Sequence, residues 1–120
     1  MAFAFEKLLV YQKAVDFADQ VCELTEQFPA RYNHLADQVN RASLSIASNI
    51  AEGNVRFTKP DRKYFFGIAR GSVQECVMQL ELARRRKLIS DEHHSKLNEQ
   101  AGLTPKIFLD VYSILPYTCT

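Results

Sequence analysis

Residues 45–53 read Ser45-Ile46-Ala47-Ser48-Asn49-Ile50-Ala51-Glu52-Gly53, and Gly71-Ser72-Val73-Gln74-Glu75 echoes this stretch further along the chain. Both stretches place small residues and an acid or amide beside an apolar stripe of helical spacing. Small residues let two helix backbones approach closely, and polar side chains buried at such a contact need hydrogen-bond partners. We therefore predict that the two stretches lie on neighbouring helices that share a polar network.

The predicted network has two interpretations. Its members are two acids and two suitable hydrogen-bond partners: Glu52, Glu75, Asn49 and Ser72. In the structural interpretation these groups fix the register of the two helices. In the catalytic interpretation the acids form a carboxylate pair for general acid–base chemistry. The structural interpretation is favoured because no nucleophile or histidine accompanies the acids, so we expect no catalytic residue and no enzyme.

Helical periodicity continues outward from these stretches, whereas the alternation typical of strands is nearly absent. We expect helices over about residues 8–28, 33–53 and 58–87, and a fourth from residue 90. Short connections between long helices favour antiparallel neighbours. The chain of 120 residues is therefore expected to form one domain, residues 1–120, with an all-α, up-and-down antiparallel four-helix bundle fold.

Punctuating residues set the expected helix ends. Gly53 is a candidate C-cap because glycine tolerates left-handed backbone. Thr58 is a candidate N-cap, and Pro60 is tolerated in the first turn that follows. A helix break at Gly71 is an alternative to one continuous third helix, but the apolar period runs through this position. Pro105 is expected to interrupt the fourth helix because an interior proline removes a backbone hydrogen bond.

The third helix is apolar on nearly every side. Its expected core face comprises Phe65, Ile68, Ala69, Ser72, Cys76, Leu80 and Ala83. A second sector carries Phe66, Val73 and Val77, and a third carries Tyr64, Met78 and Leu82. A helix that is apolar all round is typically buried all round, which a chain of this size cannot provide alone. We therefore predict a homo-oligomer with the third helix in the interface.

The cysteines and histidines argue against a metal or disulfide framework. Cys22, Cys76 and Cys119 form an odd set without a CxxC spacing, which favours a reducing cytoplasm. We expect the two cysteines within helical patterns, Cys22 and Cys76, to be buried as small hydrophobes. The histidines lie near predicted helix starts and are expected at the surface: His34, His93 and His94. We expect no metal, no cofactor and no small-molecule substrate.

Other patterns bear on the compartment. No apolar run approaches the ~18 residues that a membrane span needs, and the N-terminal residues do not resemble a secretory leader. We therefore expect a cytoplasmic protein without a membrane partner.

Positive charge is concentrated in the middle of the chain, although the net charge is only +1. Residues 41–87 hold ten basic and four acidic side chains, whereas residues 1–40 and 88–120 are net acidic. The candidates for contacting RNA phosphates are Arg56, Lys59, Arg62, Lys63, Arg70, Arg84, Arg85, Arg86 and Lys87. The competing interpretation is an assembly protein whose cations only solvate its surface. Base specificity is not predicted, since neither a stacking platform nor a groove-reading helix is identifiable.

The order of several motifs resembles a known family. The motifs are Phe5-x-Lys7-Leu8-x-Val10-Tyr11-Gln12-x-Ala14, Phe28-Pro29, Leu35-x-x-Gln38-x-x-Arg41-Ala42-Ser43-x-Ser45-Ile46-x-x-Asn49-Ile50-Ala51-Glu52-Gly53 and Phe65-x-x-Ile68-Ala69-x-Gly71-Ser72-x-x-Glu75. Over about residues 5–115 the chain is similar to four-helix-bundle proteins encoded in intervening sequences of bacterial 23S ribosomal RNA genes, often labelled S23 ribosomal proteins.

The resemblance implies a bacterial cytoplasmic protein with a left-handed up-and-down bundle that assembles into a homopentamer. Association with RNA or a ribonucleoprotein is implied by the genomic setting of the family and its basic surfaces. Similar bundles serve as accessory proteins of a reverse transcriptase in diversity-generating retroelements, which is an alternative role. No catalytic residue carries over from the family. Pro105 departs from the unbroken last helix that most relatives keep.

Overall fold

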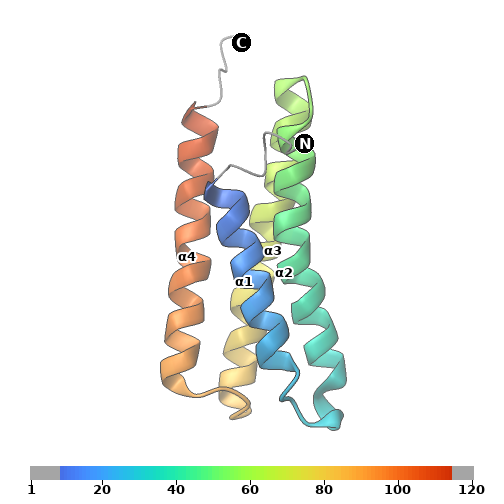
Figure 1. Ribbon diagram of the computed structural model, residues 1–120, viewed down its shortest axis with the longest axis vertical. Helices are drawn as coiled ribbons and strands as arrows, with labels where there is room; N and C mark the ends of the chain where they lie inside the picture. Colours follow the sequence, from blue (N-terminus) through green and yellow to red (C-terminus); the bar gives the residue numbers. More distant parts are fainter. Residues whose placement is uncertain (1–8, 115–120) are drawn as a thin grey trace.

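The computed structural model describes residues 9–114, with side-chain environments through residue 102. The described chain consists of α1 (Leu9–Thr25), the short 3-10 helix η2 (Ala30–Tyr32), α2 (Asn33–Asn54), α3 (Lys59–Arg85) and α4 (Asp91–Ile114). Successive long helices run in opposite directions (Figure 1). The predicted all-α, up-and-down antiparallel four-helix bundle is confirmed.

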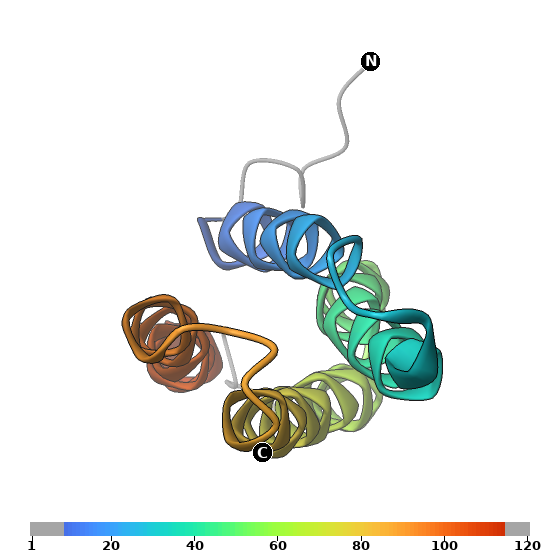
Figure 2. The same ribbon diagram turned by 90° about the horizontal axis from the view of Figure 1, so that it is seen from below.

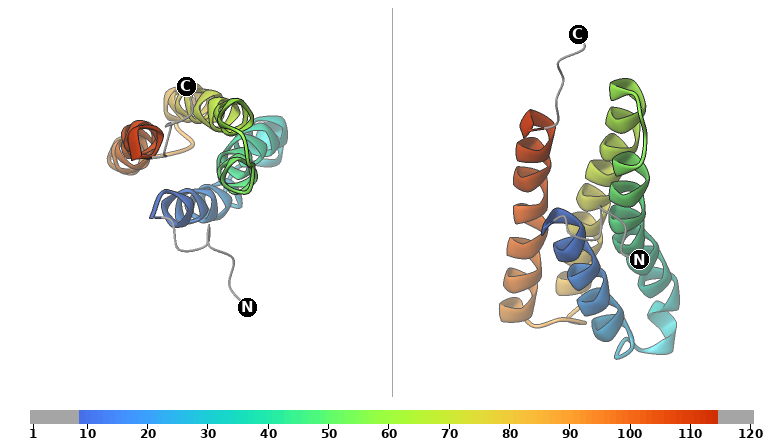
Figure 3. Two further views of the ribbon diagram at one scale, coloured as in Figure 1. Left: turned by 90° about the horizontal axis from the view of Figure 1, so that it is seen from above. Right: turned by 45° about the horizontal axis from the view of Figure 1, so that its top comes forward.

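The helices are arranged in a ring in which each long helix packs against its sequence neighbours and α4 returns to α1 (Figure 2). The contact between α2 and α3 is the most extensive of these. Helix α3 has 27 residues and α2 has 22, whereas α1 has 17. The α2–α3 hairpin therefore projects beyond the first turn of α1, which Figures 1 and 3 show at the top of the molecule.

Apolar side chains from every long helix meet inside the ring. The largest of those that are almost fully buried are Phe66, Ile46, Ile50, Leu80, Leu97, Val10, Val21 and Val39. On α1 and α2 these positions follow the three- and four-residue spacing of one helix face, as predicted from the sequence.

The core face of α3 differs from the prediction. Phe66 and Val73 are buried, whereas Phe65 is half-buried and Ile68 is 38% exposed. The reason is local. Gly53 of α2 has no side chain, and the Phe66 ring packs so close to it that a Cβ added to the glycine would lie 2.6 Å from Phe66 Cε1. Two adjacent phenylalanines gave no sequence signal to distinguish which one faces the core.

Gly53 was predicted as a left-handed C-cap, and this is wrong. Helix α2 continues to Asn54, and the described residues include no glycine with positive φ. Gly53 is required for close approach instead. The prediction for the next helix is confirmed, because the Thr58 side chain accepts a hydrogen bond from the backbone N–H of Asp61 at 3.3 Å.

Helix α3 runs without a break and ends in a left-handed residue, Lys87, with φ of 60°. The Leu88 N–H donates to the Ala83 carbonyl and the Lys87 N–H to the Arg84 carbonyl, at 2.9 and 3.0 Å. These two bonds form a Schellman motif, in which glycine is the usual left-handed residue.

Three other expectations need correction or fall outside the description. Helix α4 continues through Pro105, so the predicted interruption is wrong. Cys22 is exposed beside α2 rather than buried, whereas Cys76 is fully buried. Cys119 lies outside the described residues. Within the described part of the chain, the helices are too short or too polar to cross a membrane.

Candidate nucleic-acid interface

A small polar contact joins α2 to α3 at the predicted stretches. The Ser72 hydroxyl donates to Ser45 Oγ at 2.9 Å, across the interface between the two helices. Asn49 Nδ2 donates to Ser45 Oγ at 3.0 Å and to the Ser45 carbonyl at 2.8 Å. The predicted involvement of Asn49 and Ser72 is therefore correct, but their shared partner is Ser45 rather than an acid.

The two acids do not belong to this contact, which corrects the prediction. Glu52 is exposed and forms an ion pair with Arg56 one turn later, and Glu75 is exposed on the outside of α3. Because Ser45 faces Ser72 on antiparallel helices, the rise per residue separates the two acids by about 15 Å along the bundle. The arrangement contains no carboxylate pair of the kind that the catalytic interpretation requires.

The nine candidate cations divide between the two ends of α3, which is about 40 Å long. We call Arg56, Lys59, Arg62 and Lys63, at the projecting end of the α2–α3 hairpin, the tip cluster. We call Arg84, Arg85, Arg86 and Lys87, at the α3–α4 connection, the base cluster. Arg70 lies exposed between them. The structure therefore does not bring the nine residues together on one local surface.

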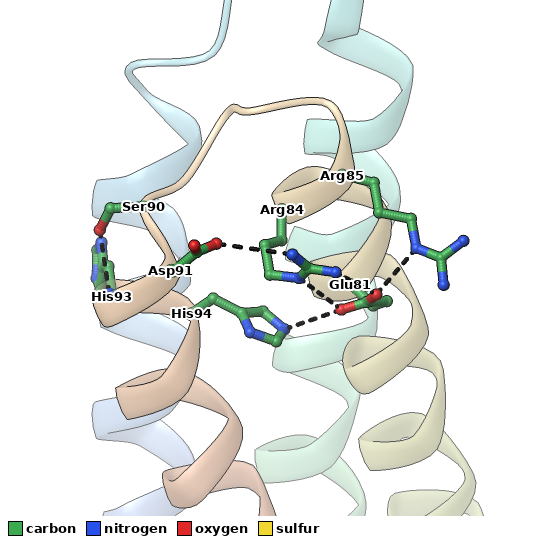
Figure 4. A network of polar contacts seen from close by, with 7 residues as sticks. All are labelled: Glu81, Arg84, Arg85, Ser90, Asp91, His93 and His94. Carbon is green, nitrogen blue, oxygen red and sulfur yellow. Dashed lines mark hydrogen bonds and ion pairs between the residues drawn. The ribbon is translucent and has the colours of Figure 1, made fainter.

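The base cluster is largely occupied by partners from the same chain. Figure 4 shows Glu81 between Arg84 and Arg85. Arg84 Nε and Nη2, on one edge of the guanidinium, donate to this carboxylate at 3.0 and 2.9 Å, and Arg85 Nε donates to it at 2.9 Å. Asp91, at the start of α4, lies 3.6 Å from Arg84. The hydrogen bonds from Arg84 and then Arg85 lower the pKa of Glu81 to about 2.

The ring of Tyr32, which lies beside the base cluster, is covered by two arginines. Arg86 Nε donates to the Tyr32 hydroxyl at 3.3 Å, and its guanidinium lies 6.0 Å from the ring centroid. Arg31 lies 5.1 Å from the same centroid. These contacts are cation–π interactions in geometry, and the hydrogen bond from Arg86 is the main cause that lowers the pKa of Tyr32.

The tip cluster holds its cations around a well-defined loop. Arg62 Nε donates to the Arg56 carbonyl at 2.7 Å, and the Arg56 guanidinium lies 4.7 Å from the centroid of Phe65. Tyr64 packs edge-on against Phe65 with ring centroids 5.1 Å apart, yet Tyr64 is 65% exposed. Phe57, in the loop between α2 and α3, is 100% exposed. Unlike Tyr32, these two aromatic side chains remain accessible.

Sequence reasoning missed Phe57 and assigned Tyr64 only to an apolar sector of the third helix. Phe57 precedes the N-cap Thr58, a position that commonly packs on the fourth helical residue. Here the fourth residue is Arg62, which is polar and engaged with a backbone carbonyl. An apolar residue before the N-cap without an apolar residue at the fourth helical position was therefore the sequence feature that could have predicted the exposed ring.

The remaining titratable groups offer no metal or nucleophile site among the described residues. These residues contain no group of three or more metal-ligating His, Cys, Asp or Glu side chains. Burial is the main cause that raises the pKa of the Cys76 thiol to about 12, so this thiol remains protonated. His94 was predicted at the surface, but its side chain is only 15% exposed and lies 3.6 Å from Glu81, so the prediction is wrong there.

Comparison with known proteins places this geometry in context. The family described as 23S rRNA-intervening sequence protein matches residues 6–108. A crystal structure of an S23 ribosomal protein family member of unknown function from Bacteroides thetaiotaomicron is similar, with a TM-score of 0.81 and 22% identity. The match covers 88% of this chain and 96% of that one, and at this identity it shows a shared fold. No curated protein matches the chain.

Proposed function

This chain belongs to the 23S rRNA-intervening sequence protein family, and we propose that it is a non-enzymatic, oligomeric protein that binds RNA or a ribonucleoprotein through the tip cluster. The observation that carries the proposal is the gathering of four cations at the projecting end of the α2–α3 hairpin, beside accessible aromatic rings. Clustered Lys and Arg side chains attract the phosphate backbone and release its counterions.

A salt titration tests RNA binding by the unmodified protein. We expect retention of a structured RNA with single-stranded loops at low salt, and a steep fall in affinity between about 50 and 200 mM salt. Binding that is absent at low salt would contradict the proposal and favour an assembly protein whose cations only face solvent.

The oligomeric part of the proposal rests on the outward side of α3. This helix exposes Met78 and Leu82 opposite the core, and Ile68 and Val77 on the two flanks of its buried face. Between α1 and α2 lies an apolar groove of about 380 Å³, lined in part by Val15, Ala18, Cys22 and Leu44. We propose that the α3 face of one copy docks in the α1–α2 groove of the next.

Charge supports a second copy as the occupant. Helix α1 has one basic and three acidic residues, whereas α3 has six basic and three acidic residues. Contacts between two different patches close into rings when the rotation permits, as the homopentamer expected from the family requires.

Light scattering on a sizing column tests the assembly. We expect a mass of several times 13.7 kDa for the unmodified protein, five times for a pentamer. Met78→Glu should lower this mass because it places a charge in the apolar contact. Asn98→Glu, at an exposed position on α4 outside the proposed contact, is the control and should leave the mass unchanged. A unit mass of 13.7 kDa at micromolar concentration would contradict the proposal.

A further inference from the structure

The loop at the tip is fixed on both sides but leaves one ring in solvent. The backbone N–H groups of Val55 and Arg56 each donate to a carbonyl of the last turn of α2, at 3.3 Å. On the α3 side, Thr58 caps the helix and Arg62 holds the Arg56 carbonyl. Between these anchors Phe57 is 100% exposed.

The residue on which this ring would usually pack is not apolar in this chain. The position before an N-cap usually packs on the fourth helical residue, and Arg62 cannot serve as that apolar partner. Phe57 also has apolar company, because Val55 is 51% exposed and Tyr64 is 65% exposed. An aromatic ring that a hydrogen-bonded loop holds in solvent, at the same end of the bundle as the exposed Tyr64, is suited to contact a flat partner.

Basic residues are close to these rings along the chain. Lys59 and Lys63 occupy the first two turns of α3, and Tyr64 follows Lys63 directly, about 100° further round the helix. Proteins that hold single-stranded nucleic acid combine such cations, which follow the backbone, with aromatic rings on which successive bases stack. A duplex hides the faces of its bases, so stacking requires unpaired nucleotides.

We propose that the tip binds unpaired nucleotides of RNA, with one base stacked on Phe57 and Tyr64 as a second stacking surface. The proposal rests on the RNA binding proposed above and specifies both its site and its ligand. No stacking platform was identifiable from the sequence alone, because the exposure of Phe57 becomes evident only in the fold.

The chain contains no tryptophan, so Phe57→Trp introduces a single fluorescent reporter at the site. We expect a single-stranded oligoribonucleotide to quench this tryptophan at low salt. Asn98→Trp is the matched control, since Asn98 is exposed on α4, outside both the tip and the proposed contact between copies. Its tryptophan should not respond. Circular dichroism confirms that both variants keep the helical fold, as expected for exposed positions.

Phe57→Ala provides the affinity measurement. We expect it to weaken single-strand binding by roughly 5- to 150-fold, the range for loss of one stacked base, while duplex binding changes little. Phe57→Tyr should restore single-strand binding because it returns a planar ring.

The possible failures are distinguishable. If the unmodified protein binds RNA with steep salt dependence but Phe57→Ala binds equally well and Phe57→Trp is not quenched, the stacking inference is wrong and RNA binding stands. If the unmodified protein retains no RNA at low salt, both proposals are wrong. If the tryptophan shifts to the blue with anionic vesicles and is not quenched by RNA, the tip contacts a lipid surface instead.

Discussion

At the base of the bundle, Arg84 and Arg85 share the carboxylate of Glu81, and Tyr32 is covered by Arg31 and Arg86. At the tip, four cations surround a loop from which an aromatic ring projects fully into solvent. Each cluster has four cations, and each has two acids nearby, Glu52 and Asp61 at the tip and Glu81 and Asp91 at the base.

Cations at both ends have partners within the chain, since at the tip Arg56 pairs with Glu52 and Arg62 donates to the Arg56 carbonyl. The difference between the clusters therefore lies in their aromatic rings and not in their charge. In the base cluster, Arg31 and Arg86 lie over the Tyr32 ring, whereas Phe57 at the tip is 100% exposed. A base could stack on Tyr32 only by displacing these guanidinium groups, whereas the Phe57 ring is open. A count of basic residues, or a run such as Arg84-Arg85-Arg86-Lys87, does not by itself identify a binding surface.

The largest expected effect comes from removing cations at one end only. Lys59→Ala/Arg62→Ala/Lys63→Ala should flatten the salt dependence of single-strand binding by about 2 in the log–log slope, since each lost phosphate contact contributes about 0.7. Fluorescence anisotropy of a labelled oligonucleotide at several salt concentrations measures the slope.

The matched variant is Arg84→Ala/Arg85→Ala/Arg86→Ala at the base. It removes the same number of cations from the chain, but we expect it to leave the slope nearly unchanged. An equal loss in both variants would show that the tip has no special role, and a larger loss at the base would reverse the comparison.

The packing beneath the tip gives the next largest effect. Gly53→Ala should lower the free energy of unfolding by about 1–2 kcal/mol, because the new Cβ would lie 2.6 Å from the buried Phe66 ring. This steric cost exceeds the gain of up to ~1 kcal/mol that alanine brings to a helix interior. Chemical denaturation followed by circular dichroism measures it.

Gly102→Ala on α4 is the control, since this glycine is exposed and an added Cβ would meet nothing within 4 Å. This variant should be slightly more stable than the unmodified protein. If Gly53→Ala were equally stabilising, the Phe66 ring would not be packed tightly against Gly53.

A smaller effect is expected at the base, where Lys87 occupies the left-handed position of the Schellman motif. Lys87→Gly should raise the free energy of unfolding by about 0.5–1 kcal/mol, because glycine adopts this backbone without the Cβ penalty. Single-strand RNA affinity should not change if Lys87 lies outside the binding surface. A loss of RNA affinity together with the gain in stability would return the base cluster to consideration.

The smallest expected effect concerns Glu81. Its folded-state pKa of about 2 lies below its ordinary value of 4.5, so its contribution to stability is present above pH 4.5 and is lost as the pH falls toward 2. Glu81→Gln should therefore flatten the stability profile between these pH values, whereas Glu99→Gln, on exposed α4 surface, should flatten it less. Thermal unfolding in acidic buffers measures both.

The same substitution sharpens the comparison of the clusters. Glu81→Gln releases Arg84 and Arg85 from their shared carboxylate, so RNA affinity at neutral pH should rise modestly. A fall in affinity would mean that the ion pairs position these arginines for RNA instead of occupying them.

The sequence predicted the fold well because helix periodicity and caps are local properties. The three- and four-residue spacing identified the faces of α1 and α2, and Thr58 marked the start of α3. The core face of α3 was misjudged because the choice between Phe65 and Phe66 depends on the space left by Gly53 across the helix pair.

The candidate site was less predictable for the same reason. The cations could be found in the sequence, and Glu81 lies one turn before Arg84 and Arg85, but Arg86 meets Tyr32 only when segments 54 residues apart pack. Glu52 and Glu75 were expected to share one polar network with Asn49 and Ser72, but the register set by Ser45 and Ser72 separates the two acids. The periodicity of the sequence assigned each residue to a helix, but the packing of the helices determined which side chains it contacts.

The central claim is that RNA contacts the tip and not the base, and photocrosslinking tests it most directly. A single-stranded RNA containing 4-thiouridine is bound to the unmodified protein at low salt and irradiated, and the crosslinked peptides are identified by mass spectrometry. We predict crosslinks at Phe57 and Tyr64. Crosslinks confined to residues 84–90 would contradict the account.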